Sequence, residues 1–364
     1  MTITAKTKPN VYHLFHSGLE HHNQHMKTLF EEQYDDYQQF NVVTDPHGIV
    51  VDKAGYHSKL TSVSEYRRFL KKICPSKDVV IIHGLYTNWH YLLPLLAPKL
   101  AKRVIWDIWG DDFYSSRRLQ KAKSIKDRIT YYIRRYAVPK FSALSGFKDD
   151  VADVTKFFSF EGSVFFNNHP LRENLDRLAN EHQTLSTYHS KRILVGNSGS
   201  RSNEHLRGLS LLQKCKDFQK FQLIMIFSTD VNQAYLQEVL GYIEEHNISN
   251  VEIITEMMSF DVFIDFMRAI DIVLLPHRRQ QGVGTSNLSL MLAKPVYMDL
   301  SVSTANYYQD EGVTVFDIES LADMPHEVFG PTVLNNNVKT IKSLFGRSAV
   351  ANKWKSVIEN YING

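Results

Sequence analysis

The chain has 364 residues and a mass of 42.1 kDa, which corresponds to roughly two domains of about 150 residues each. Hydrophobic residues make up 43% and charged residues 22% of the sequence, and these values exclude a globally disordered chain or a low-complexity fibre. The 42 basic residues nearly balance the 39 acidic ones. We therefore expect no nucleic-acid partner, and any affinity for phosphates or anionic lipids depends on local clusters of Lys and Arg.

Cysteine usage and hydropathy indicate the compartment. Cys74 and Cys215 are the only cysteines, and neither lies in a C-x-x-C or Cys/His ligand pattern, which favours a reducing cytoplasm. No apolar segment follows residues 1–10, so we expect no signal peptide. The longest uncharged window, Val79–Pro98, is interrupted by histidines, glycine and prolines. It predicts a strand, a loop and a helix rather than a membrane span.

Short apolar runs alternate with helical patterns along the chain, which is typical of βαβ units on parallel sheets. In the N-terminal half the predicted strands are Val11–Phe15, Val79–His83, Val104–Ile108 and Val164–Phe166. In the C-terminal half they are Ile193–Val195, Leu223–Phe227, Val251–Ile254, Ile272–Leu275, Pro295–Met298 and Val313–Phe316. A polar passage, His169–Lys191, separates the halves and marks a domain boundary.

This alternation predicts an α/β fold with two Rossmann-like domains. We place the first domain at residues 1–187, the second at 188–345, and a C-terminal helix at 346–364 that packs back across the domains. Two such domains facing each other bring the carboxyl ends of both sheets to one interdomain cleft, where α/β folds bind ligands. We therefore expect the chemistry in the loops at the strand ends.

Five histidines lie within thirteen positions near the N-terminus. They are His13, His16, His21, His22 and His25. Their spacing does not match a metal motif such as H-E-x-x-H, so a polar loop at a strand end is the favoured interpretation. His22 is a candidate general base, because the ordinary pKa of an imidazole lies near working pH.

Polar and aromatic residues also follow two predicted strands, at His83-Gly84 and in Trp106–Tyr114. Carboxylates at strand ends can take a proton from an attacking hydroxyl, and Trp rings stack on sugars. Asp112 is therefore a second candidate base, although an Asp at this place is equally typical of a helix cap or turn. The adjacent pair Asp111-Asp112 has no third ligand in the pattern, so we predict no metal site.

A basic stretch from Arg117 to Arg135 holds eight basic residues against the single acid Asp127. Its apolar residues fall on one helical stripe, which predicts one basic amphipathic helix over residues 117–136. Such a helix is typical of a protein that lies on an anionic membrane surface. A solvated helix packed on its own domain is the alternative.

The segment Ile193–His205 runs from a buried strand into a Gly/Ser loop and then into a predicted helix. Backbone N–H groups of such a loop can bind a phosphate together with the helix N-terminus, and Arg201 can hold it through two hydrogen bonds. Ser202 or Asn203 is the predicted helix cap. A tight turn with an ordinary cap explains the same pattern without a ligand.

The segment Asp271–Asn287 repeats the order of apolar strand, glycine loop and helix start. Its G-x-G lacks the third glycine of a dinucleotide fingerprint and lies late in the chain, which argues against an NAD(P) domain. Gly282 and Gly284 let the backbone approach a diphosphate, and Arg278 or Arg279 can offset the charge without a metal. A nucleotide sugar is the favoured ligand; a solvated surface role for the arginines is the alternative.

Together these motifs resemble the TDP-N-acetylfucosamine:lipid II N-acetylfucosaminyltransferases, also called 4-alpha-L-fucosyltransferases or glycosyltransferase family 56. The resemblance is spread over most of the chain, and Gly196–His205 is its most specific block. The other matching motifs are His21-His22-Asn23, His83-Gly84, Ile108-Trp109-Gly110 with Asp112 and Tyr114, Phe260-Asp261, Arg279–Gly282 and Gly284-Thr285.

The resemblance implies a GT-B fold that binds the acceptor mainly in the first domain and a TDP-sugar mainly in the second, with no metal or other cofactor. It implies transfer of 4-acetamido-4,6-dideoxygalactose (Fuc4NAc) to an undecaprenyl-diphosphate-linked glycan, a step in the assembly of enterobacterial common antigen. We therefore expect a peripheral enzyme at the cytoplasmic face of the bacterial inner membrane.

These considerations give three groups of expected site residues. Nucleotide-sugar binding is expected from Gly196, Asn197, Ser198, Gly199, Arg201, Asn203, Glu256, Arg279, Gln280, Gln281, Gly282, Gly284 and Thr285. Acceptor binding is expected from His21, Asn23, His83 and Trp109, and acceptor activation from His22 and Asp112. We expect stabilisation of the departing TDP diphosphate to be the main catalytic effect.

Three rival functions remain open. A GT-B transferase could use another nucleotide-deoxysugar donor, and a non-catalytic protein could bind a sugar nucleotide without releasing the sugar. A nucleotide-sugar oxidoreductase or epimerase would need an early G-x-G-x-x-G, which the sequence does not contain.

Overall fold

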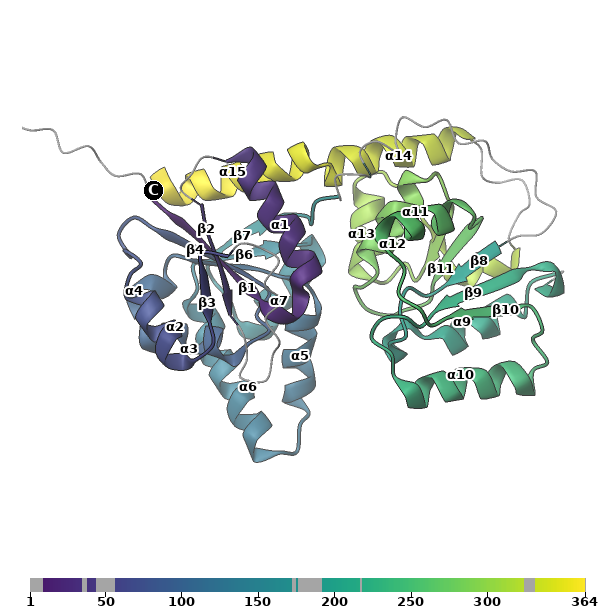
Figure 1. The fold of residues 1–364 in the computed structure, drawn as a ribbon, viewed down its shortest axis with the longest axis horizontal. Coiled ribbons are helices and arrows are strands. Elements are labelled where there is room, and N and C mark those ends of the chain that lie inside the picture. The colour runs from purple at the N-terminus through teal and green to yellow at the C-terminus, as the bar shows by residue number, and fades with distance from the viewer. Residues whose placement is uncertain are drawn as a thin grey trace, which may run out of the picture. The chain divides into compact units, whose positions relative to one another are not determined.

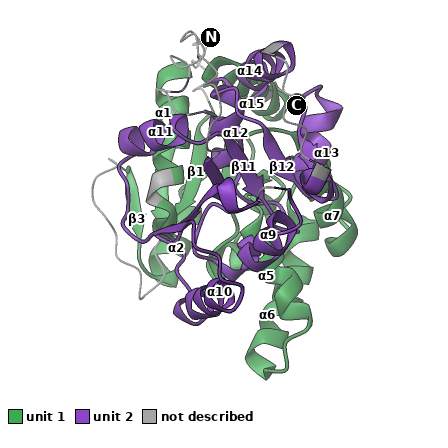
Figure 2. Ribbon diagram, turned by 90° about the vertical axis from the view of Figure 1, so that its right-hand side faces the viewer, with its two compact units in different colours: residues 1–170, 347–364 green, residues 171–346 purple. Residues whose placement is uncertain are grey.

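The structure is a computed structural model that describes residues 9–34, 38–43, 56–171, 175, 192–216, 218–323 and 331–363. It divides into two compact units, residues 1–170 with 347–364, and residues 171–346 (Figure 2). The predicted boundary between residues 187 and 188 lies outside the described residues. The C-terminal helix, predicted to pack across the domains, belongs to unit 1.

Unit 1 is built on a parallel sheet of seven strands in the order β3-β2-β1-β4-β5-β6-β7 (Figure 1). The strands are β1 (Val11–His16), β2 (Gln38–Val43), β3 (Ser58–Leu60), β4 (Val79–His83), β5 (Val104–Asp107), β6 (Ala143–Gly146) and β7 (Ser163–Phe166). Every residue of β4 is buried, as expected for a continuous apolar strand that is covered on both faces.

Helices cover both faces of this sheet. They are α1 (Glu20–Gln33), α2 (Val63–Leu70), α3 (Asn88–Leu96), α4 (Pro98–Ala101), α5 (Asp111–Gln120), α6 (Ile125–Ala137), α7 (Lys148–Phe158) and α15 (Arg347–Asn363), with single 3₁₀ turns at η1 (Ser17–Leu19) and η2 (Val138–Lys140). One face carries α1 and α15, where Phe30 packs edge-on against the buried Trp354. The other face carries a second core that includes Tyr66, Trp106 and Phe158.

The single basic helix predicted over residues 117–136 is wrong. Helix α5 ends at Gln120 and α6 begins at Ile125, with a turn between them. Among the described residues, none of the helices combines the length and the apolar character that crossing a bilayer requires.

Unit 2 contains a parallel sheet of six strands in the order β10-β9-β8-β11-β12-β13. The strands are β8 (Arg192–Val195), β9 (Gln222–Ile226), β10 (Val251–Ile254), β11 (Ile272–Leu275), β12 (Val296–Met298) and β13 (Phe316–Asp317). The helices are α9 (His205–Leu212), α10 (Gln233–Glu245), α11 (Phe260–Arg268), α12 (Val283–Met291), α13 (Ser303–Asp310) and α14 (Pro331–Phe345), with 3₁₀ turns η3 (Arg201–Asn203), η4 (Phe218–Lys220) and η5 (Ile318–Asp323). Both sheets are thus doubly wound, and such sheets bind ligands beyond the carboxyl ends of their strands.

Candidate functional site

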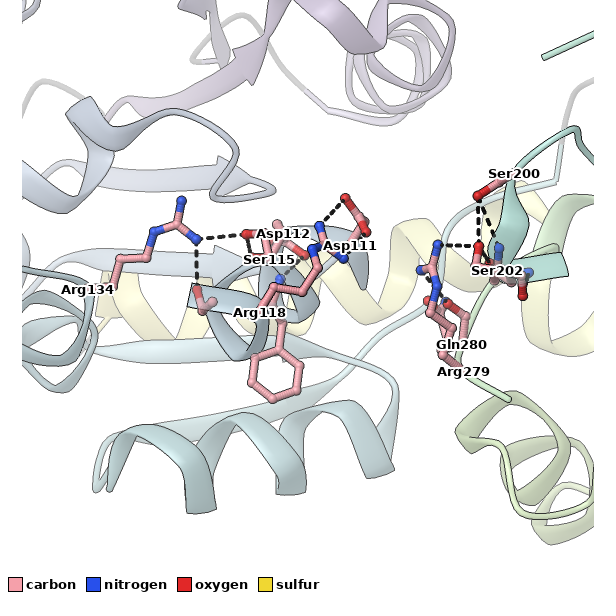
Figure 3. A network of polar contacts seen from close by, with 12 residues as sticks. Asp111, Asp112, Ser115, Arg118, Arg134, Ser200, Ser202, Arg279 and Gln280 are labelled. Carbon is pink, nitrogen blue, oxygen red and sulfur yellow. Dashed lines mark hydrogen bonds and ion pairs between the residues drawn. The ribbon is translucent and has the colours of Figure 1, made fainter. Parts of the chain in front are cut away.

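Two loops of unit 2 meet at the carboxyl ends of neighbouring strands. Strands β8 and β11 pair in parallel, with Ile193 opposite Ile272, so the loops that follow them start side by side. Ser202 Oγ donates to Gln281 Oε1 at 2.8 Å, and Gln281 Nε2 donates to the Ser202 carbonyl at 3.0 Å. Arg279 Nη2 donates to Ser202 Oγ at 3.0 Å (Figure 3). The two glycine turns that the sequence singles out therefore lie against each other.

Three N–H groups of the loop after β8 are already hydrogen-bonded within unit 2. The Gly196 N–H donates to the Leu274 carbonyl at 2.8 Å, the Asn197 N–H to Asn203 Oδ1 at 2.9 Å, and the Gly199 N–H to the Thr229 carbonyl at 2.8 Å. The prediction that the N–H groups of this loop are free to bind a phosphate is therefore wrong for these three residues. Their bonds instead fix the loop on its own sheet.

The helix cap predicted at Ser202 or Asn203 is also wrong. Helix α9 begins only at His205, after Glu204 in the left-handed conformation, and Ser200 caps the preceding turn η3. Asn203 is buried, and its Nδ2 donates to Ser198 Oγ at 2.8 Å. Its side chain therefore shapes the loop rather than facing a nucleotide.

The N-terminus of α12, after β11, is in contrast uncapped. Gly282 occupies the cap position with φ +67°, so it offers no side-chain acceptor to the first N–H groups of the helix. A Cβ at Gly282 would lie 3.0 Å from Asn197 Oδ1, whereas one at Gly284 would meet nothing within 4 Å. Packing explains glycine at position 282 but not at position 284. The helix start therefore suits an approaching anion.

The half-buried Asn197 and the buried His277 place buried polar atoms near this helix start. Asn197 Oδ1 accepts no hydrogen bond from the described residues, and neither ring nitrogen of His277 forms a hydrogen bond of normal geometry. Burial, with the nearby Arg279, lowers the pKa of His277 to about 4, so the ring is neutral near pH 7. Buried polar atoms without partners are costly and in native proteins call for a functional explanation. The expected site residues do not include His277, although its place two residues after β11 is a signal for a role at this edge of the sheet.

The arginines of these loops have different surroundings. The Arg201 guanidinium bonds to both carboxylate oxygens of Glu238 on α10. Arg278 is exposed and forms an ion pair with Glu204 at 3.4 Å. Arg279 lies between the loops, on Ser202.

The remaining predicted donor residues lie at different distances from this meeting point. Thr285 is buried in the first turn of α12, and Gln280 is buried in the loop before it. Glu256 is exposed after β10, two strands from β8, and does not take part in the contacts between the loops.

In unit 1 a chain of buried side chains runs across four neighbouring strands, from Gln38 of β2 through β1 and β4 to Asp107 of β5. Gln38 Oε1 lies 2.6 Å from His13 Nε2, and His13 Nδ1 lies 3.0 Å from His83 Nε2. His83 Nδ1 lies 2.9 Å from Asp107 Oδ2, which also accepts a 2.8 Å hydrogen bond from Trp109 Nε1. Burial raises the pKa of Asp107 to about 7 and lowers that of His83 to about 3.

Three predicted catalytic or acceptor residues are buried, which contradicts their direct roles. His83 is fully buried with both ring nitrogens engaged. Asn23 is fully buried and donates to the His16 carbonyl at 2.8 Å. Asp112 is fully buried and accepts hydrogen bonds from Trp106 Nε1 and from three backbone N–H groups. Burial raises the pKa of Asp112 to about 6. Each of these three side chains supports the surrounding backbone and side chains from the interior of unit 1.

The open part of this site is a cluster of rings. His22 is exposed, and its ring lies edge-on to Trp109 at 5.8 Å and to His169 at 5.7 Å. Trp109 and His169 lie 5.0 Å apart. Burial, with nearby His22 and His25, lowers the pKa of His169 well below its usual value. A histidine ring can accept a proton, and the neighbouring indole can stack on a sugar.

His169 is not among the expected site residues, because the polar passage from residue 169 onward resembles a linker between domains, although it follows strand β7. The side chain of His21 lies outside the described ones. Among the described residues, groups of three or more His, Cys, Asp and Glu side chains that could hold a metal ion are absent.

Comparisons with known proteins agree with this architecture. The family described as 4-alpha-L-fucosyltransferase glycosyl transferase group 56 matches residues 8–324. A glycosyltransferase from Rickettsia africae is similar over 98% of this chain and 100% of that one, with a TM-score of 0.69 at 13% identity. HepE from Anabaena, solved with UDP, covers 96% of this chain and 100% of its own at TM-score 0.69 and 12% identity. WaaG, a glycosyltransferase involved in lipopolysaccharide biosynthesis, is similar over 97% of this chain and 100% of its own, with a TM-score of 0.62 at 14% identity. These structures share the GT-B fold with this chain.

Proposed function

Since the chain belongs to the 4-alpha-L-fucosyltransferase family, glycosyl transferase group 56, we propose that it transfers Fuc4NAc from a TDP-sugar to an undecaprenyl-diphosphate-linked glycan. Glycosyl transfer itself is supported by the family and by the GT-B fold. The donor, the acceptor and the place of the reaction are our proposals. The acceptor would be lipid II of enterobacterial common antigen or a related surface polysaccharide, at the cytoplasmic face of the inner membrane.

One observation carries the donor half of this proposal: the uncapped start of α12 lies against the loop after β8. In this proposal the first N–H groups of α12 bind a diphosphate oxygen, and the positive end of the helix favours the negative charge. Arg279 beside Ser202 offsets more of the charge that develops when the sugar leaves. We assign the arginine contact to Arg279 rather than to Arg201, because Arg201 is bound to Glu238.

The acceptor half rests on the ring cluster of unit 1. His22 is the exposed imidazole of the cluster and accepts the proton of the attacking hydroxyl. Trp109 provides a face for the acceptor sugar, and its indole N–H is held by Asp107. In this proposal the leaving group is stabilised by groups of the chain itself, without a metal cofactor.

The test is a transfer assay with TDP-Fuc4NAc and a synthetic polyprenyl-diphosphate disaccharide, followed by mass spectrometry. We expect a product heavier by one Fuc4NAc residue, formed equally well in EDTA. Binding of TDP, UDP and GDP is compared by thermal shift in parallel. Stronger stabilisation by UDP or GDP would contradict the donor and favour a transferase for another nucleotide sugar. Binding of TDP without sugar release would favour a non-catalytic sugar-nucleotide-binding protein.

A further inference from the structure

Helix α6 carries an exposed apolar stripe. Ile125, Ile129, Tyr132 and Tyr136 are 75%, 55%, 62% and 49% exposed. Their spacing of four, three and four residues places them on one face of the helix. Large apolar side chains that line up on a surface in this way mark an interaction site rather than a random exposure.

The opposite face of α6 is firmly packed on unit 1. Arg134 is buried and donates to Ser115 Oγ at 2.7 Å (Figure 3). It also donates to Ser116 Oγ at 2.9 Å and lies over the ring of Tyr91 at 4.6 Å. Ala137 is also buried. The stripe therefore belongs to an anchored helix whose core-facing side is already filled.

Positive charge surrounds the stripe. Residues 121–140 contain seven Lys and Arg residues and one acid, Asp127. Lys121, Lys123, Lys126 and Arg128 are exposed, and none forms an ion pair with a residue in the described part of the chain. In α5, by contrast, Arg117 pairs with Asp153 at 3.1 Å and Arg118 with Asp111 at 3.2 Å. The net positive charge is therefore concentrated on α6 and the turn before it.

We propose that this surface of α6 docks the protein on an anionic lipid bilayer. The two isoleucines enter the boundary between headgroups and acyl chains, the two tyrosines lie at headgroup level, and the lysines contact the anionic lipids. Charge complementarity selects this occupant, because a second copy would bring two clusters of equal sign together. In Figures 1 and 2, α5 and α6 extend away from the sheet of unit 1. The proposal is independent of the sugar that is transferred.

The test is co-sedimentation of the full-length protein with vesicles of phosphatidylcholine alone or with about 30% phosphatidylglycerol. We expect binding only to the vesicles that contain phosphatidylglycerol, and weaker binding as salt rises. The double variant Ile125→Ser/Ile129→Ser and the triple variant Lys121→Glu/Lys123→Glu/Lys126→Glu should each lower vesicle affinity by about tenfold or more. TDP binding measured without vesicles should be unchanged, which separates this result from a failure of the proposed donor site.

Matched controls are available on other surfaces. Leu240→Ser/Val262→Ser removes exposed apolar side chains of unit 2, and Lys99→Glu/Lys102→Glu reverses exposed charges elsewhere on unit 1; both should bind vesicles like the unmodified protein. The proposal is overturned if the unmodified protein does not bind anionic vesicles, or if the isoleucine variant co-sediments with them as strongly as the unmodified protein does. A dimer in analytical ultracentrifugation that the isoleucine variant abolishes would identify a second copy as the occupant and also overturn it.

Discussion

The indole Nε1 of Trp109 donates a 2.8 Å hydrogen bond to Oδ2 of the buried Asp107. Through this bond the half-buried ring that faces His22 and His169 is tied to His83 and, behind it, to His13. The buried pair Asp107 and His83 thus supports the open part of the candidate acceptor site.

Substitutions in this pair should change the pH dependence of stability in opposite directions. Burial raises the pKa of Asp107 from 3.8 to about 7 and lowers that of His83 from 6.5 to about 3. Between pH 4 and 6.5 the folded pair holds one proton on Asp107, and the unfolded pair holds one on the histidine. The numbers of bound protons are equal, so the pair contributes little slope.

Asp107→Asn leaves His83 alone, and stability should then fall as pH drops below about 6.5, because the unfolded state binds more protons. His83→Gln leaves Asp107 alone, and stability should fall as pH rises from about 4 to about 7. Each slope should approach about 1.4 kcal/mol per pH unit relative to the unmodified protein. All four tryptophans lie in unit 1, so urea unfolding followed by Trp fluorescence reports this unit. Parallel slopes in the three proteins would contradict the neutral pair.

Replacing Gly284 should separate ligand binding from packing. A Cβ there meets nothing within 4 Å, and the residue lies in a helix. Gly284→Ala should therefore leave the free energy of unfolding unchanged or raise it by up to about 1 kcal/mol. If a diphosphate approaches this backbone, the methyl group should raise the Kd for TDP about tenfold in calorimetry. The matched control is Gly241→Ala in α10, which is equally open and should leave TDP binding unchanged.

Removal of Arg279 should weaken donor binding more than removal of its neighbour. Arg279→Ala deletes the guanidinium that lies on Ser202 between the two loops, and we expect a loss of about 1.5–3 kcal/mol, a roughly tenfold to hundredfold rise in the Kd for TDP. Arg278→Ala removes an exposed cation paired with Glu204 and should change the Kd less than about threefold. Equal effects of the two substitutions would point to general electrostatic attraction instead of a specific contact.

His22→Gln should slow transfer without weakening the donor site. His22 is exposed, so the substitution should leave unfolding unchanged, whereas loss of a general base lowers kcat by about 100-fold or more. The Kd for TDP should stay constant, because the donor site is in unit 2. His246→Gln, an exposed histidine after α10, serves as the control. A kcat close to that of the unmodified protein would remove His22 from the mechanism.

The sequence predicts the central strands and the meeting of the glycine loops well, for a physical reason. Strands such as β4 and β11 are buried on both faces, so nearly all of their residues must be apolar. A continuous apolar run in the sequence is therefore enough to predict them. Loops after adjacent parallel strands must then share one edge of the sheet. The apolar pattern does not predict strand β6, because Ala143–Gly146 is short and ends in Ser and Gly.

Features that depend on residues far apart in the sequence could not be predicted from local patterns. The sequence around His83 and Asp112 does not predict that these side chains are buried, because the groups that surround them come from several strands and loops. The break between α5 and α6 lacks both Gly and Pro. It is set by packing, since the buried Arg134 of α6 bonds back to Ser115 and Ser116 of α5.

The return of α15 to unit 1 has a consequence for biosynthesis. Unit 2 consists of contiguous residues, whereas the sheet of unit 1 lacks the cover of Trp354 until α15 has emerged from the ribosome. During translation, unit 2 can therefore complete its core while one face of unit 1 is still exposed to chaperones. In a chain that lacks α15, unit 2 should accordingly fold correctly, whereas the exposed face of unit 1 should cause the chain to aggregate.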